Sequence, residues 1–264
     1  MYKIEVDAHS HTIFTRHAYS TIAENVAKAK NKGLLGLGMT DHFGLMLPWF
    51  YKERPYDFEN HVKPSNLPKV MDGIRVYNGV EMDIIGFDGA LAASDSLPAS
   101  GDKHYMDYEN FAQYLLAKKE LVIASLHYFH GFKDEGVAQN TQMYINVVST
   151  KGVDILGHPA RAGVEFDIAA VVAAAKAHNT MVEVNNEDLS SRPHMAEVFM
   201  EVAKECARQG ALICVNSDAH SCFNVGHVDE ALAMLESINF PLELIANRTK
   251  QSFEEALRAS GRQP

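Results

Sequence analysis

The sequence predicts an α/β barrel of parallel strands, because seven short apolar segments alternate with helical ones. The strand segments are rich in Ile, Val and Leu, as expected for strands that are buried on both faces. The helical patterns between them indicate that each strand is joined to the next by a crossover helix. Seven such units in 264 residues predict one domain over residues 1–264 with a closed or nearly closed barrel. An open doubly wound sheet is the alternative architecture.

The boundaries of the elements follow from apolar runs and capping residues. The first helix is expected to open with Thr21 and Glu24, which have capping-box spacing, and to end at Gly33. The predicted strands cover residues 4–8, 34–39, 75–82, 121–126, 153–156, 181–184 and 212–215. The other predicted helices cover residues 108–118, 141–149, 167–178, 194–208, 229–237 and 252–259. Segment 43–72, rich in proline and aromatic residues, is expected to form a lid or substrate wall, and segment 92–107 a second loop.

The composition is that of an ordinary soluble globular protein, with 47% hydrophobic and 22% charged residues. A formal charge of −10, from 24 basic and 34 acidic residues, argues against a nucleic-acid partner. Bound divalent cations would reverse that sign locally and still allow an anionic substrate. We see no secretory signal and no apolar run of about 20 residues for a membrane helix. The three cysteines lack Cys-x-x-Cys spacing, so we expect a reducing, cytoplasmic environment.

Potential metal ligands stand at or just beyond the predicted strand ends. His9 and His11 follow an extended segment, in which residues two apart face the same side, so both can reach one cation. Asp7 shares that face and is expected to orient one of the imidazoles. The full set is His9, His11, His17, His42, Glu81, His127, His158, Asp218 and His220. Because the C-terminal ends of all barrel strands surround one mouth, this pattern predicts a metal centre there.

Each of these residues has an ordinary explanation when it is considered alone. An exposed strand-end glutamate or a hydrogen-bonded core histidine is common in globular proteins. However, seven of the thirteen histidines lie at a predicted strand end, which favours metal binding. Glu81 is best placed to bridge two cations, because a carboxylate has two oxygens. Residues 183–186, at the end of the sixth strand, carry polar groups suited to supporting ligands or contacting substrate.

These segments resemble the PHP superfamily, named for polymerase and histidinol phosphatase domains. The matching motifs are Asp-Ala-His-Ser-His from residue 7, Thr-Asp-His from residue 40, Gly-Val-Glu from residue 79, Gly-His-Pro from residue 157 and Ser-Asp-Ala-His from residue 217. They occur in the family's order, with His17 and His127 between them, and span essentially the whole chain. The segment from residue 17, His-Ala-Tyr-Ser-Thr, is most similar to the small stand-alone bacterial phosphoesterases. The resemblance implies a distorted seven-stranded, TIM-like (βα)7 barrel with up to three metal ions at the strand C-termini.

The resemblance also implies how the ligands are divided. The first ion would be held by His9, His11, Glu81 and Asp218. The second would be held by His17, His42 and His220, and the third by Glu81, His127 and His158, with Glu81 bridging. All nine positions carry the expected residue types. We therefore expect two or three divalent ions, with zinc as the first choice and manganese or iron as alternatives.

The implied function is hydrolysis of a small-molecule phosphate monoester through a metal-bound hydroxide at a trinuclear site. Glu81 and Asp218 are the predicted catalytic residues. Arg16 and Arg161 are predicted to bind the phosphate, because guanidinium groups match its geometry. Either arginine could instead be a solvated surface residue.

Three other functions remain as alternatives. An amidohydrolase also begins with His-x-His, but usually has eight strands and often a carbamylated lysine at the fourth, where this chain has His127. A phosphodiesterase or nuclease of the same superfamily should carry a basic groove, which the −10 charge disfavours. A non-catalytic, metal-dependent regulatory domain is the third alternative, which the intact ligand set disfavours. The expected partner is a small phosphorylated substrate, with no stable nucleic acid and no membrane; the oligomeric state is not predicted.

Overall fold

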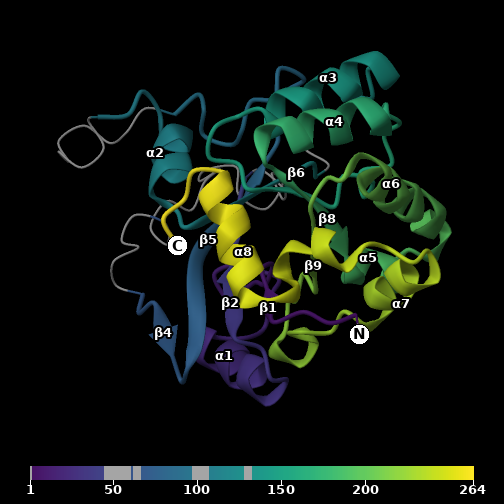
Figure 1. The fold of residues 1–264 in the computed structure, drawn as a ribbon. Helices are drawn as coiled ribbons and strands as arrows, with labels where there is room; N and C mark the ends of the chain where they lie inside the picture. The colour runs from purple at the N-terminus through teal and green to yellow at the C-terminus, as the bar shows by residue number, and fades with distance from the viewer. Residues whose placement is uncertain (1, 45–60, 62–66, 97–106, 128–132) are drawn as a thin grey trace.

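A computed structural model describes residues 2–44, 61, 67–96, 107–127 and 133–264, and shows a nearly closed barrel (Figure 1). Seven parallel strands form the barrel, and each is hydrogen-bonded to the next. In their order around the barrel they are β1 (Val6–Asp7), β2 (Gly36–Met39), β5 (Ile74–Asp83), β6 (Leu121–Ser125), β7 (Ile155–Gly157), β8 (Met181–Asn185) and β9 (Ile213–Asn216). The predicted seven-stranded α/β barrel is therefore confirmed.

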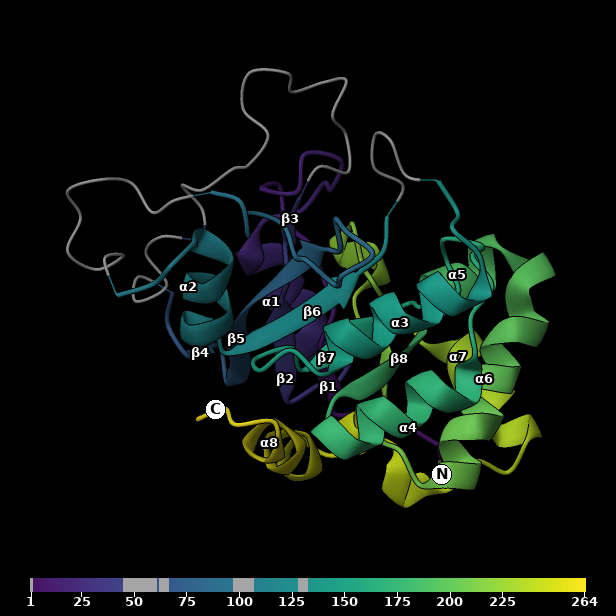
Figure 2. The same cartoon turned by 90° about the horizontal axis from the view of Figure 1, so that it is seen from above.

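Helices surround the strands and close one end of the barrel. The α-helices are α1 (Ile22–Asn31), α2 (Phe111–Lys118), α3 (Val137–Val148), α4 (Ile168–His178), α5 (Asn186–Ser191), α6 (Ala196–Gln209), α7 (Asp229–Ser237) and α8 (Lys250–Ala259). Short 3₁₀ helices cover Pro193–Met195, Cys222–Asn224, Leu242–Leu244 and Ala246–Arg248. In Figure 2, α3, α4 and α6 flank the strands on one side, and α8 lies with both chain ends far from the short strand β3 (His42–Phe43). The predicted helices all occur, with the Thr21/Glu24 capping box formed, whereas α5 was not predicted.

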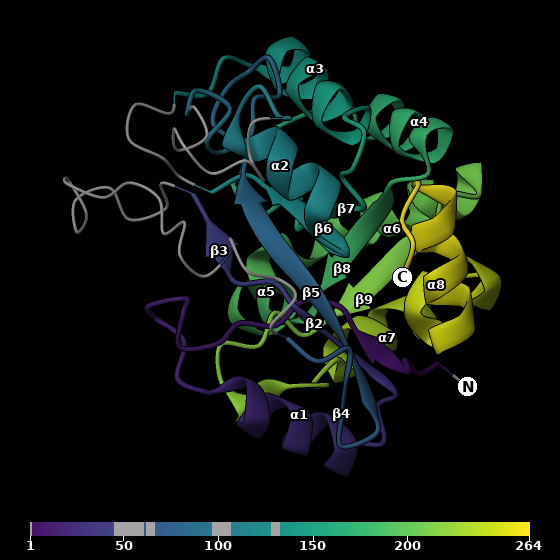
Figure 3. The same cartoon turned by 90° about the vertical axis from the view of Figure 1, so that its left-hand side faces the viewer.

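Two short strands beside β5 were also not predicted. β3 pairs with β5 in parallel, and β4 (Val70–Met71) pairs with its other end in antiparallel fashion (Figure 3). The pairing of β3 sets His42 directly opposite Glu81. The predicted lid, 43–72, lies largely outside the described residues, as does most of the predicted loop 92–107.

A buried asparagine joins the first and last strands of the barrel. Among the described residues, β9 and β1 share only an isolated bridge beyond their ends, between Ser10 and Ala219. Asn247 occupies the gap between the two strands. Its Nδ2 donates to the carbonyl oxygens of Val6 (2.8 Å) and Val215 (2.5 Å), and its Oδ1 accepts the Val215 N–H (3.0 Å). The amide side chain thus replaces the missing backbone hydrogen bonds and completes the barrel.

The barrel interior changes from apolar to polar along its axis. The part of the interior that α8 covers is an apolar cluster, in which Tyr77, Ile123 and Met181 pack with Phe253 and Leu257 of this helix. Because inward-facing residues are two apart along a strand, the same strands carry polar groups towards their C-terminal ends. The site described next therefore has a dry, packed floor. No helix in the described part of the chain is long and apolar enough to cross a membrane.

Candidate metal centre

Glu81 lies at the centre of the polar end of the barrel and is fully buried. Its Oε2 lies 2.7 Å from His42 Nδ1 and 3.2 Å from His9 Nε2. Its Oε1 lies 2.9 Å from His158 Nε2 and 3.6 Å from His127 Nε2. His11 Nε2 also lies 3.5 Å from Oε2, so one carboxylate faces five imidazoles, three around Oε2 and two around Oε1.

Asp218 is a second buried carboxylate that is surrounded by imidazoles. Its Oδ1 lies 3.0 Å from His11 Nε2 and 3.4 Å from His9 Nε2. The His11 ring lies beside the rings of His42 and His220, with centroids 4.3 Å and 4.2 Å away. His17, the most exposed of the nine, stacks on His220 at 4.6 Å. The nine residues that the strand-end pattern singled out are therefore brought together at one mouth.

Four of these imidazoles have one ring nitrogen bonded to an acceptor and the other turned towards the cluster. For His9, Nδ1 lies 2.7 Å from Glu183 Oε1. The corresponding Nδ1 contacts of the others are His127 with Asp83 Oδ1 at 2.8 Å, His220 with the Asp218 carbonyl at 2.9 Å, and His11 with Thr15 Oγ1 at 3.1 Å. Such contacts orient the rings of metal-binding histidines and select their tautomers.

The partners Asp83 and Thr15 were not predicted from sequence. Asp83 could have been found, because it follows Glu81 by two residues on the same strand and so shares its face. Asp7 was expected to orient an imidazole, and this is wrong. Its carboxylate accepts instead from Ser217 N and Oγ and from Gly226 N, so it fastens β1 to the chain after β9.

Among the described residues, several buried polar atoms around Glu81 have no hydrogen-bond partner, which is costly unless something else binds them. They include Nε2 of His9, His127 and His220, Nδ1 of His42 and Oε2 of Glu81; the last two lie 2.7 Å apart but do not form a hydrogen bond. In the part of the chain that the structure describes, three groups of side chains have ligand atoms close enough together to hold one metal ion each. These are His9, His11 and Asp218; His11, His42 and His220; and His42, Glu81 and His127. Unpaired imidazole nitrogens next to carboxylates are a donor set that suits zinc and related divalent ions.

The electrostatics keep the carboxylates ionised. Although burial opposes it, the imidazoles led by His9 and His42 hold the pKa of Glu81 well below its usual value. His9 and Arg161 likewise outweigh burial and lower the pKa of Asp218 well below normal. For His9, burial lowers the pKa, but Asp218, Glu183 and Glu81 outweigh it and raise the pKa well above its usual value. The cavity therefore attracts positive charge, as a cation site must.

Two other imidazoles, the fully buried His11 and the exposed His17, have lowered pKa values. Burial, followed by the positive charge of His42 and His220, lowers the pKa of His11 well below its usual value and that of His17 to about 4. Both rings are therefore neutral near pH 7, which is the form that binds a metal ion.

Two of the nine residues have an unusual backbone. His158 has φ +24° and Asp218 has φ +54°, values that residues other than glycine rarely adopt. Such strain commonly occurs at functional sites, where the surrounding structure maintains it. Gly157, before His158, allows a close approach, since a Cβ there would lie 2.1 Å from Ser125 Oγ.

The two arginines differ in their surroundings. Arg161 donates from Nε to Asp188 Oδ1 (2.7 Å) and from Nη2 to Asp218 Oδ2 (2.6 Å). Within the described part of the chain, its Nη1 has no hydrogen-bond partner. Arg16 is exposed on the rim next to His17.

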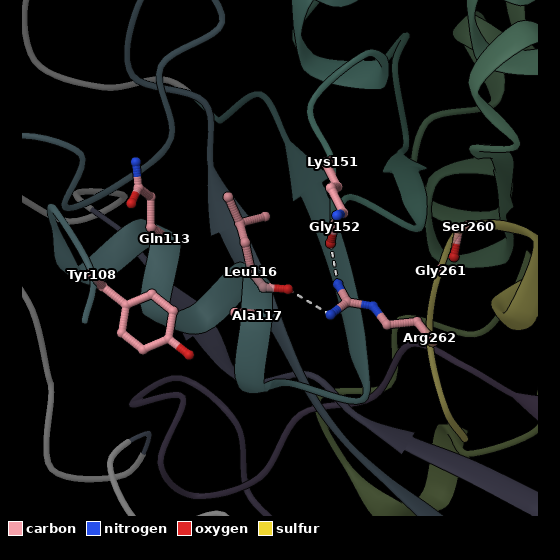
Figure 4. Close-up of a pocket in the computed structure, with 9 residues that line it drawn as sticks. All are labelled: Tyr108, Gln113, Leu116, Ala117, Lys151, Gly152, Ser260, Gly261 and Arg262. Carbon is pink, nitrogen blue, oxygen red and sulfur yellow. Dashed lines mark hydrogen bonds between the residues drawn. The ribbon is translucent and has the colours of Figure 1, made fainter. Parts of the chain in front are cut away.

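A separate surface cavity of about 430 Å³ lies at the opposite end of the barrel, beside the starts of β6 and β7 (Figure 4). The guanidinium of Arg262 points into its wall but is already bonded to Asp154 and to the carbonyl oxygens of Leu116, Lys119 and Gly152. This arrangement fastens the C-terminal segment to the barrel. The cavity contains none of the nine residues.

Comparisons with known proteins agree with this geometry. The chain is 34% identical over 259 residues to a probable phosphatase of Caldicellulosiruptor saccharolyticus, with 98% of each chain covered. It is 35% identical over 261 residues to a probable phosphatase of Clostridium botulinum, with 97% of this chain and 96% of that one covered. Among solved structures, histidinol phosphate phosphatase from Lactococcus lactis, in complex with zinc, L-histidinol and phosphate, shares the fold. The TM-score is 0.61 and the identity 16%, with 91% of this chain and 95% of that chain covered. The PHP domain family model matches residues 7–261, and the chain therefore belongs to the PHP domain family.

Proposed function

We propose that this protein is a metal-dependent phosphatase that hydrolyses a phosphate monoester of a small molecule. The observation that carries the proposal is the cluster of buried imidazole and carboxylate atoms around Glu81, several of which have no hydrogen-bond partner in the described part of the chain. The relatives named probable phosphatases support the same reaction class. The family match over 7–261 supports one catalytic domain, and the earlier expectation of a single domain over residues 1–264 stays a prediction.

The proposed cofactor is two or three divalent ions, zinc first. The zinc in the structure of the Lactococcus lactis enzyme supports this choice, and manganese and iron stay as alternatives. The division of ligands over three ions stays a prediction. The groups of ligand atoms that lie close together differ from this division in two places. His11 rather than His17 joins His42 and His220, and His42 rather than His158 joins Glu81 and His127. When bound, such ions supply a nucleophile from water at neutral pH and neutralise the charge of the phosphate.

Four side chains of the protein would hold the ions, position the attacking water and bind the phosphate. Glu81 would hold the ions at a fixed spacing, because its two oxygens face different imidazoles. Asp218 would present Oδ1 to the ions and to the proton of the attacking water, since its ionised carboxylate is fixed through Oδ2 by Arg161 and Asn185. Arg161 would bind a phosphate oxygen through Nη1, and Arg16 would approach it from the rim. The dry floor of the barrel would exclude other water.

The test is hydrolysis of a panel of phosphate monoesters, with a phosphodiester control, by protein whose bound metal has been counted. We expect chelator-sensitive monoester hydrolysis that His9→Ala abolishes. His178→Ala is the matched control, because it removes an exposed histidine at the end of α4. Diester hydrolysis alone would indicate a phosphodiesterase instead. Full metal loading without hydrolysis of any ester would refute the enzymatic proposal in favour of a regulatory domain.

A further inference from the structure

The strand β8 contributes none of the nine potential ligands, yet two of its inward-facing side chains contact three of them. Glu183 contacts His9 and the backbone of His158. Asn185 donates from Nδ2 to Asp218 Oδ2 at 3.2 Å. Because β8 pairs with β7 and β9, it reaches residues that lie on both sides of it. This strand therefore acts on the site through the ligands of its neighbours.

Glu183 is buried and has four hydrogen-bond partners. Oε1 lies 2.7 Å from His9 Nδ1 and accepts from Asn216 Nδ2 at 2.8 Å. Oε2 accepts from His158 N at 2.9 Å and from Asn185 Nδ2 at 3.1 Å. Three of these partners, the His158 N–H and the two asparagine amide groups, can only donate a hydrogen bond. The fourth partner is His9 Nδ1, and an oxygen of an ionised carboxylate can only accept, so Nδ1 must donate to it. When a metal ion takes the place of the proton on Nε2 and the His9 ring is neutral, its remaining hydrogen must therefore be on Nδ1.

We propose that Glu183 is a positioning residue that fixes the tautomer and orientation of His9, so that the lone pair of Nε2 faces the metal centre. His9 Nε2 lies between Glu81 Oε2 and Asp218 Oδ1, at 3.2 Å and 3.4 Å. With the hydrogen on Nε2 instead, that nitrogen could not bind an ion. The inference rests on the proposed function only in treating His9 as a metal ligand.

Replacing Glu183 with glutamine tests this, because an amide cannot satisfy four donors. If its NH2 group takes the place of Oε2, it meets the N–H of His158 and the amide of Asn185. If it takes the place of Oε1, it meets the Asn216 amide and favours the wrong tautomer of His9. Glu183→Asp is the second variant, since it keeps the charge but withdraws the carboxylate by about 1.5 Å, one carbon–carbon bond.

Asp7→Asn is the matched control. Asp7 is also a buried carboxylate whose partners are all donors, Ser217 N, Ser217 Oγ and Gly226 N. None of these partners is an imidazole. The control therefore measures the cost of exchanging a buried carboxylate for an amide near the site without touching His9.

The experiment measures zinc affinity of the full chain by competition with a chromophoric chelator, starting from metal-free protein. Nitrogen-detected spectra of zinc-loaded protein with isotope-labelled histidine locate the ring hydrogen of His9. We expect Glu183→Gln and Glu183→Asp to weaken binding of at least one zinc ion by about 10–100-fold, while Asp7→Asn stays within about threefold of wild type. We expect the hydrogen on Nδ1 in the wild type.

Three results would overturn the inference. The first is a Glu183→Gln protein with wild-type zinc affinity. The second is a Glu183→Asp protein with wild-type affinity, which would mean that only the charge matters. The third, which needs no variant to fold, is wild-type protein with the His9 hydrogen on Nε2. A wild type that binds zinc but hydrolyses no phosphate ester would refute the proposed function, and the affinity ratios would still test Glu183.

Discussion

Removing the side chain that joins β9 to β1 should destabilise the whole barrel. In Asn247→Ala, the N–H of Val215 and the carbonyl oxygens of Val6 and Val215 lose the partners that they have in the wild type. A buried backbone group without a partner costs about 1–3 kcal/mol, so three such groups give about 4 kcal/mol once partial relaxation is allowed for. That is a large part of the roughly 5–15 kcal/mol by which proteins of this kind are stable.

The assay is urea unfolding followed by far-ultraviolet circular dichroism, on metal-free protein and on protein with excess zinc. Asn31→Ala is the control, because Asn31 is exposed at the end of α1. The loss should also reduce the stabilisation that zinc provides, since His9 and His11 follow β1 whereas Asp218 and His220 follow β9. A loss below about 1 kcal/mol in Asn247→Ala would refute the view that this side chain closes the barrel.

Three further predictions concern the metal centre and a buried lysine. Glu81→Ala should lose at least one bound ion per chain. It should also reduce turnover by more than roughly 100-fold, the upper end of the loss that follows when a residue that only contacts a metal ligand is removed; unchanged metal content would refute the bridging role. Zinc at a hundredfold its Kd should stabilise the metal-free protein by about 2.7 kcal/mol per site, or roughly 5–10 °C in Tm, and an unchanged Tm would count against a structured metal centre. Burial lowers the pKa of Lys119 from 10.5 to about 8, so between these values the unfolded chain binds more protons and wild-type stability should rise with pH. Lys119→Met should remove this rise and be about 1–3 kcal/mol more stable than wild type near pH 7; parallel pH curves of urea unfolding would contradict the assignment.

The strand order and the position of the metal centre could be predicted because both depend on local patterns. An apolar run followed by a potential ligand recurs along the chain, and a parallel barrel places every strand end at one mouth. His9, Glu81 and Asp218 therefore converge, although they lie far apart in the sequence.

The partners of the supporting residues depend on packing between distant segments. Sequence alone therefore suggested a supporting or substrate-contacting role for residues 183–186 but did not identify which ligand each of them contacts. Glu183 lies 174 residues from His9, and only the order of strands around the barrel brings the two together. Asn247 looks like any loop asparagine in the sequence, because the gap that it fills exists only in the folded barrel. The strand β3 was missed since two residues are too few for a periodic pattern to be recognised.

The charge of the site bears on how many ions it holds and on which ester it prefers. Five buried carboxylates line it or contact its arginine, namely Glu81, Asp83, Glu183, Asp188 and Asp218. Against these stand two guanidinium groups, Arg161 beside Asp188 and Asp218 and Arg192 beside Asp188, which leave three negative charges in a low-dielectric cavity. Two divalent ions would give the site one positive charge, and a third would give it three. The metal-bound hydroxide of the proposed reaction would reduce these charges to zero and two, and two positive charges balance a phosphate monoester dianion but not a diester monoanion. We therefore expect three ions and a preference for monoesters to occur together, and full-rate monoester hydrolysis with only two ions bound would contradict this reasoning.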